Sequence, residues 1–109
     1  VGEAFNLGEN LGLDLKKLYD VLSTSTGNCW AVNTYCPIKG VGPNSPADNN
    51  FQPGFSANLM LKDLTIALNA IKDTNTSAFF GTKSQENFDR MINDDKGELD
   101  FSAIVNFNK

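Results

Sequence analysis

The chain has 109 residues, nine of them Lys or Arg and thirteen Asp or Glu, which gives a net charge of −4. An acidic chain without clustered positive charge is a poor candidate for a nucleic-acid or anionic-membrane surface, so we expect neither partner. The sequence has no histidine, which removes the commonest general base and any Ser–His or Cys–His nucleophile. One domain with a modest core is the natural expectation for this length.

The sequence shows neither an apolar run of membrane-spanning length nor the pattern of a signal peptide, so we expect a protein that is not secreted. The two cysteines, Cys29 and Cys36, lie seven residues apart. Without histidine or a second cysteine pair they do not complete a four-ligand metal site. We expect both thiols to be reduced and packed, as is usual outside secreted proteins, with a disulfide between them as the alternative.

Residues 1–11 carry apolar side chains at helical spacing from the first position onward. Because no capping residue precedes them, we interpret this segment as the end of a longer helix and the chain as a fragment cut inside it. Gly12 is expected to end this helix, and Asp14 to cap a second one over residues 15–25. Asn28 is predicted to cap a short helix that stops before Pro37.

Residues 37–54 contain all four prolines of the chain and show no helical period. A loop of this length inside a compact domain is usually functional or wrapped over a partner. The alternative is a disordered linker.

The clearest helical pattern follows, over residues 56–71, with Ser56 as the predicted N-cap. Its apolar positions recur at steps of three and four, as on one face of a helix: Ala57, Met60, Leu61, Leu64, Ala67, Leu68 and Ile71. In a helix extended back to Phe55, that ring and Lys62 would share a face, because they are seven residues apart. With Asp63 they would form a binding corner. The alternative interpretation places Phe55 in the core and both charges in solvent.

Another helix is predicted over residues 78–95 and a last short one, capped by Asp100, over residues 101–107. The residues expected to face the core in the first of these are Phe80, Lys83 or Ser84, Phe88, Met91 and Ile92. No segment alternates as a strand does. The predicted fold is therefore all-α, a cluster of about six helices.

These residues alone leave three interpretations open: half of an enzyme whose site is completed elsewhere, a helical dimerisation module, or a bundle that binds a small molecule in its core. Four segments then resemble one family along nearly the whole chain. They are EAFNLGENLGLD (3–14), STGNCWAVNTYCPIKGV (25–41), ADNNFQPGFSANLMLKDLTIAL (47–68) and DFSAIVNF (100–107). The chain resembles the C-terminal helical domain of the 3-hydroxyisobutyrate dehydrogenases, in the β-hydroxyacid dehydrogenase family related to 6-phosphogluconate dehydrogenase.

The resemblance implies reversible, NAD-dependent oxidation of 3-hydroxyisobutyrate to methylmalonate semialdehyde, a step of valine breakdown. It also implies an N-terminal Rossmann domain that binds the dinucleotide, and a catalytic lysine on the helix upstream of Val1. No catalytic residue is therefore expected in this chain, and the isolated chain is expected to be inactive. Partners implied are the 3-hydroxyacid substrate, the protein's own Rossmann domain, and further copies in a dimer or tetramer.

By resemblance, Lys62 is the lysine that contacts the cofactor, and Phe55 and Asp63 line or support the substrate end of the interdomain cleft. For Asp63 a structural role is an equal alternative. Trp30 and Tyr35 are expected to pack in the core, with a place in the pocket wall as the alternative.

Two other functions remain as alternatives. One is a sibling enzyme of the same family that reduces tartronate semialdehyde or succinic semialdehyde. The other is a dimerisation module without chemistry. The expected location is the cytoplasm if the source is bacterial and the mitochondrial matrix if it is eukaryotic.

Overall fold

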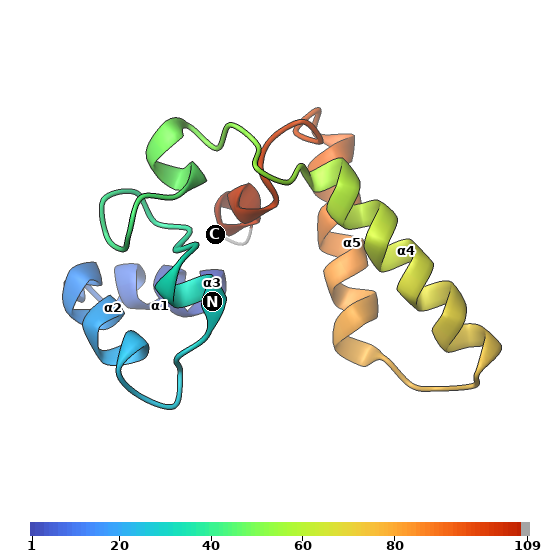
Figure 1. Ribbon diagram of the computed structural model, residues 1–109, viewed down its shortest axis with the longest axis horizontal. Coiled ribbons are helices and arrows are strands. Elements are labelled where there is room, and N and C mark those ends of the chain that lie inside the picture. The colour runs from blue at the N-terminus through green and yellow to red at the C-terminus, as the bar shows by residue number, and fades with distance from the viewer. Residues whose placement is uncertain (108–109) are drawn as a thin grey trace. The chain divides into compact units, whose positions relative to one another are not determined.

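The computed structural model describes residues 1–107, and these are all-helical apart from loops and one isolated bridge between Ser56 and Asp100. This confirms the predicted all-α class, and each of the six predicted helices is present (Figure 1). The chain divides into two compact units, Pro53–Phe101 and the segments on either side of it. Within residues 1–107, no helix is both long and apolar enough to cross a bilayer.

The first unit, Val1–Gln52 with the segment from Ser102 onward, holds three short α-helices. They are α1 (Gly2–Asn10), α2 (Leu15–Ser23) and α3 (Trp30–Asn33). The Asp14 side chain accepts hydrogen bonds from the N–H groups of Lys16 and Lys17, which confirms the predicted cap of α2. Gly12 has a φ of +73°, a value that favours glycine and lets the chain turn sharply between α1 and α2.

The start of α3 differs from the prediction. This helix is only four residues long, and Cys29 occupies its N-cap position without a side-chain hydrogen bond. The Asn28 side chain instead accepts a hydrogen bond of 2.7 Å from the Asn33 side chain. The expected capping role of Asn28 was therefore wrong, because its amide group bonds to a side chain at the far end of α3.

The core of the first unit forms where α1 meets the C-terminal 3₁₀-helix η2 (Phe101–Phe107). Asn6 donates from its side-chain nitrogen to the Val105 carbonyl oxygen at 2.9 Å, although the two residues are 99 positions apart. Phe5 and Val105 are both buried. The last predicted helix therefore packs against the first helix within the first unit.

The long loop over residues 37–54 is ordered by side chains, so the disordered-linker alternative is wrong. It contains a short 3₁₀-helix, η1 (Pro46–Asn49). The Asp48 carboxylate accepts hydrogen bonds from the N–H groups of Gly40 at 2.8 Å and Ser45 at 3.0 Å. The Ser45 hydroxyl donates to the Cys36 carbonyl oxygen at 2.7 Å. The Asp48 carboxylate therefore bonds to the backbone at two separate points within the Pro/Gly-rich segment.

Asp48 should make the stability of this loop depend on pH. The N–H groups of Ser45 and Gly40 favour the ionised carboxyl and hold its pKa below the ordinary value. A lowered folded-state pKa contributes stability that is present above the unfolded pKa and lost as pH falls through the folded pKa. We expect Asp48→Asn to destabilise the protein at pH 7, and the difference from wild type to shrink below about pH 4. Urea unfolding of both proteins at pH 7 and below about pH 4 checks this. An equal loss of unfolding free energy in the two proteins on lowering the pH would contradict the prediction.

The second unit, Pro53–Phe101, is built on a pair of helices, α4 (Ala57–Asp73) and α5 (Phe79–Asn93). They lie side by side, joined by a short turn (Figure 1). The Ser56 hydroxyl accepts a hydrogen bond from the Leu59 N–H, which confirms the predicted N-cap of α4. Leu68 of α4 and Phe88 and Met91 of α5 are buried between the elements of this unit.

Of the residues expected to face this core, Phe80 does not, and of the alternatives Lys83 and Ser84 only Ser84 is partly buried. Phe80 is 83% exposed and packs its ring against that of Phe79, with the ring centres 5.5 Å apart. Lys83 is exposed and forms an ion pair with Glu86. A hairpin of two helices covers only one face of each, so residues at the edge of a broad apolar stripe stay in solvent.

Candidate functional site

Lys62 and Asp63 lie on the exposed side of α4. Their side chains are 57% and 51% exposed, and the Lys62 Nζ lies 2.7 Å from an Asp63 carboxylate oxygen. An ion pair this exposed contributes little to stability, typically about 0–1 kcal/mol. The lysine is therefore easily released from Asp63 and available to bind an anionic or polar group.

The same face of α4 carries two exposed apolar side chains, Leu59 and Ile66. They lie three residues before and four residues after Lys62, and residues at these spacings are neighbours on a helix surface. Leu59 and Ile66 therefore place apolar surface on both sides of the Lys62 ammonium group along the helix. Neither residue was predicted, because the apolar spacing of this helix indicates only its single buried stripe.

Phe55 is not on the helix. It precedes the N-cap Ser56, so the predicted helix face shared by Phe55 and Lys62 was wrong. The ring of Phe55 is half-buried and packs edge-on against Phe101, with the ring centres 6.2 Å apart and the planes at 77°. Lys62 lies five residues beyond the first residue of α4, which amounts to about 7.5 Å along the helix axis. The structure thus pairs Lys62 with Asp63 and places Phe55 in a separate contact.

Asp100 holds the backbone at the start of α4. One oxygen of its carboxylate accepts hydrogen bonds from the N–H groups of Gly54 and Phe55, each at 3.1 Å. Asp100 itself is fully buried. Asp100 was predicted only as the cap of the last helix, which does begin at the next residue, Phe101. No local pattern signals a bond between residues 45 positions apart.

Trp30 and Tyr35 form a stacked pair in the first unit, with ring centres 4.8 Å apart and planes at 21°. Trp30 is 58% exposed, so the expectation that it packs in the core was wrong. Tyr35 is half-buried. Both nearby cysteines are free thiols, as expected, but only Cys36 is buried; Cys29 is exposed, so its expected packing was wrong. Burial raises the pKa of the Cys36 thiol, which makes it less reactive.

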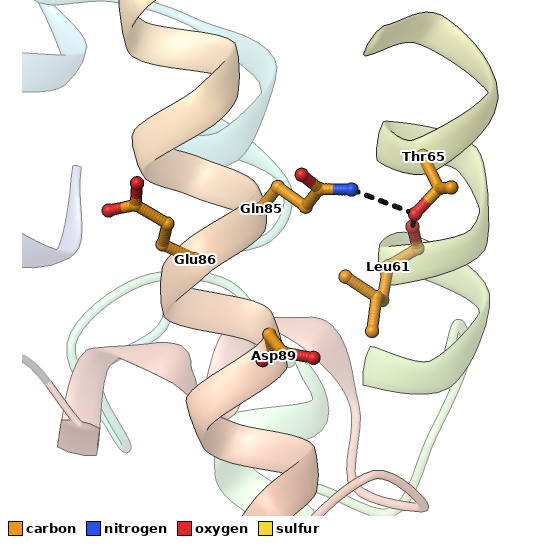
Figure 2. Close-up of a pocket in the computed structure, with 5 residues that line it drawn as sticks. All are labelled: Leu61, Thr65, Gln85, Glu86 and Asp89. Carbon is orange, nitrogen blue, oxygen red and sulfur yellow. Dashed lines mark hydrogen bonds between the residues drawn. The ribbon is translucent and has the colours of Figure 1, made fainter. Parts of the chain in front are cut away.

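A cavity of about 260 Å³ lies between α4 and α5 (Figure 2). It is lined by Leu61, Thr65, Gln85, Glu86 and Asp89. The Gln85 amide donates to the Thr65 hydroxyl at 3.0 Å, and that hydroxyl donates to the Leu61 carbonyl oxygen at 2.8 Å. None of the three predicted site residues lines this cavity. Over residues 1–107, no group of acidic or cysteine side chains is arranged to hold a metal ion.

The chain is similar to proteins of known family along nearly its whole length. The family described as NAD-binding of NADP-dependent 3-hydroxyisobutyrate dehydrogenase matches residues 1–108. A probable 3-hydroxyisobutyrate dehydrogenase of Mycobacterium tuberculosis is 46% identical over 105 residues, 96% of this chain and 35% of that protein. The human mitochondrial 3-hydroxyisobutyrate dehydrogenase is 38% identical over 105 residues, 96% of this chain and 31% of that protein.

Solved structures agree with this assignment. The Mycobacterium tuberculosis 3-hydroxyisobutyrate dehydrogenase with L-serine has a TM-score of 0.92 and 45% identity, covering 97% of this chain and 36% of that one. A Salmonella typhimurium protein of the same name, with a TM-score of 0.81 over 97% of this chain and 35% of its own, is 23% identical and supports the fold alone. The chain therefore spans about a third of the length of these relatives. On these grounds the chain belongs to the 3-hydroxyisobutyrate dehydrogenase family.

Proposed function

We propose that this chain is the C-terminal domain of an NAD-dependent dehydrogenase that oxidises 3-hydroxyisobutyrate to methylmalonate semialdehyde in valine catabolism. The observation that carries the proposal is Lys62. It occupies the position of the family's cofactor-contacting lysine by resemblance, and its ammonium group lies in solvent with only the neighbouring Asp63 carboxylate as its ion-pair partner among residues 1–107.

The residues around Lys62 fit a dinucleotide bound by another domain. An exposed ammonium group is able to donate to phosphate, hydroxyl or carboxamide oxygens of such a ligand. The exposed Leu59 and Ile66 on the same face provide apolar surface for the domain that carries it. When bound, the nicotinamide supplies the redox chemistry by accepting a hydride from the substrate, while the protein supplies position and electrostatics.

Phe55 and Asp63 have supporting roles in this proposal. The Phe55 ring limits the substrate end of the cleft, and its edge-on contact with Phe101 fixes the ring's position. Asp63 orients Lys62, as their 2.7 Å ion pair suggests. The alternative for Asp63 is direct contact with the substrate.

The remaining parts of the site lie on other chain segments in this proposal. The relatives are about three times as long as this chain, which leaves room for a Rossmann domain and for the catalytic lysine that the resemblance places upstream of Val1. The protein is proposed to form a dimer or tetramer. It acts in the mitochondrial matrix if its source is eukaryotic, as the names of the vertebrate relatives suggest, and in the bacterial cytoplasm otherwise.

The test is a substrate and cofactor comparison with the full-length protein. We expect NAD-linked oxidation of 3-hydroxyisobutyrate with a higher kcat/KM than that of L-serine, which is also a 3-hydroxy acid, and a lower KM for NAD than for NADP. Faster reduction of tartronate or succinic semialdehyde would assign the protein to a sibling activity. No turnover with any of these substrates, combined with stable dimerisation, would favour the non-enzymatic dimerisation module.

A further inference from the structure

The first residues of α4 and Phe55 just before it are hydrogen-bonded to a second backbone segment, residues 97–101. The Ala57 N–H donates to the Leu99 carbonyl oxygen at 2.8 Å, and the Asn58 N–H donates to the Gly97 carbonyl oxygen at 3.0 Å. The Phe101 N–H donates to the Phe55 carbonyl oxygen at 2.9 Å. These bonds join the two ends of the second unit and define where α4 begins.

Asp100 completes this arrangement with its side chain. Its carboxylate accepts the N–H groups of Gly54 and Phe55, while the next residue, Phe101, donates to the Phe55 carbonyl oxygen. The Phe55 backbone is therefore held on both sides. The Phe101 ring then contacts the Phe55 ring edge-on. Backbone position and ring position of Phe55 both depend on the residue pair 100–101.

A buried carboxylate is a costly way to provide this support. Removing an ionised group from water is unfavourable unless hydrogen bonds replace its hydration. Bonds from N–H groups to a charged acceptor are stronger than those to a neutral one, so a carboxylate restrains its donors more tightly than an amide does. The completely buried Asp100 carboxylate therefore restrains the backbone at Gly54 and Phe55.

We propose that Asp100 is a positioning residue for Phe55, and that through Phe55 it determines how well the enzyme distinguishes 3-hydroxy acids with and without a methyl branch. Asp100 does not touch the substrate. It acts by holding the Gly54–Phe55 backbone, so that the Phe55 ring packs against the methyl branch and favours the branched acid. This inference rests on the proposed function, because it uses the substrate-facing role of Phe55.

The test compares kcat/KM for 3-hydroxyisobutyrate with kcat/KM for 3-hydroxypropionate, which lacks the methyl group, in the full-length protein. A single methyl group in an apolar pocket is worth about 10- to 200-fold in such a ratio. We expect Phe55→Ala to reduce the ratio about tenfold and Asp100→Asn to reduce it several-fold in the same direction. The double variant should have the ratio of Phe55→Ala alone, because the two residues act as one unit.

Glu98→Gln provides the matched control. Glu98 lies in the same segment, and its carboxylate accepts a 2.7 Å hydrogen bond from the Asn58 side chain, but it is exposed and bonds to no backbone of Phe55. This variant should keep the wild-type ratio. If it shifted the ratio as much as Asp100→Asn does, a general loosening of the segment would replace the proposed role of Asp100.

A measurement independent of activity separates local positioning from global stability. Amide hydrogen exchange in Asp100→Asn should accelerate by tenfold or more at Gly54 and Phe55, and much less at Ala57, whose acceptor is the Leu99 carbonyl oxygen. If Asp100→Asn does not fold, Asp100→Ser serves instead, since its hydroxyl is too short to reach both N–H groups. Equal acceleration at all three amides would overturn the inference.

The outcomes distinguish this inference from the proposed function. A ratio that falls in Phe55→Ala and stays at the wild-type value in Asp100→Asn overturns the role of Asp100 and leaves the proposed function intact. A ratio unchanged in both variants overturns the substrate-facing role of Phe55 and the role of Asp100 together.

Discussion

Replacing Lys62 by alanine in the full-length protein is expected to weaken NAD binding by about 10- to 150-fold. The estimate corresponds to the loss of one charge-assisted hydrogen bond, about 1.5–3 kcal/mol. Because the proposed role of Lys62 is to contact the cofactor and not the reacting carbon, the KM for NAD should rise by more than kcat falls. Isothermal titration with NAD and steady-state kinetics with NAD as the varied substrate measure the two quantities.

Lys72→Ala is the matched control for this variant. Lys72 is an exposed lysine in the last turn of the same helix, ten residues beyond Lys62 and therefore on a different face. It should change NAD binding by less than twofold. An unchanged KM for NAD in Lys62→Ala would remove the cofactor role from Lys62, and a loss of kcat alone would instead indicate a role in the chemical step.

Local sequence patterns predicted most of the helices of this fold. Steps of three and four between apolar residues, together with side chains that cap a helix within three positions, are short-range signals, and they located α4 and the caps at Asp14 and Ser56. For Phe80 these short-range signals were not sufficient to predict burial. A helical period shows which residues share a face, but how much of that face is covered depends on the neighbouring element, and α4 does not cover Phe80.

The candidate site was predicted less completely than the fold. The exposed position of Lys62 and Asp63 on α4 follows from their place beside the buried stripe. The position of Phe55 does not, because the helix starts at Ala57 and the residue is held by contacts with a segment about 45 positions away. The buried carboxylate of Asp100 likewise bonds to residues that are distant in the sequence. Such long-range bonds leave no trace in the local spacing of residues, so only the structure reveals them.

The isolated chain of residues 1–109 is expected to catalyse no NAD-linked oxidation of 3-hydroxyisobutyrate, although it should fold. The resemblance places the lysine that acts as general acid/base, and the glycine-rich turn that binds the pyrophosphate, on sequence upstream of Val1. Losing a positioned general base alone costs about 100- to 10,000-fold, and losing the dinucleotide site removes the hydride acceptor as well. Absorbance at 340 nm with NAD in excess measures turnover, and circular dichroism shows whether the helices are formed.

An inactive fragment is informative only if the same chain becomes active when the missing part is supplied. We therefore expect the isolated chain to gain activity when it is joined to the upstream segment, and the Lys62→Ala version of the joined protein to show the weaker NAD binding described above. The gain requires the two parts to share one site, with the cofactor bound by one and contacted by Lys62 of the other. Turnover by residues 1–109 alone would contradict the proposal directly, because it would require a general base among side chains to which the resemblance assigns no such role.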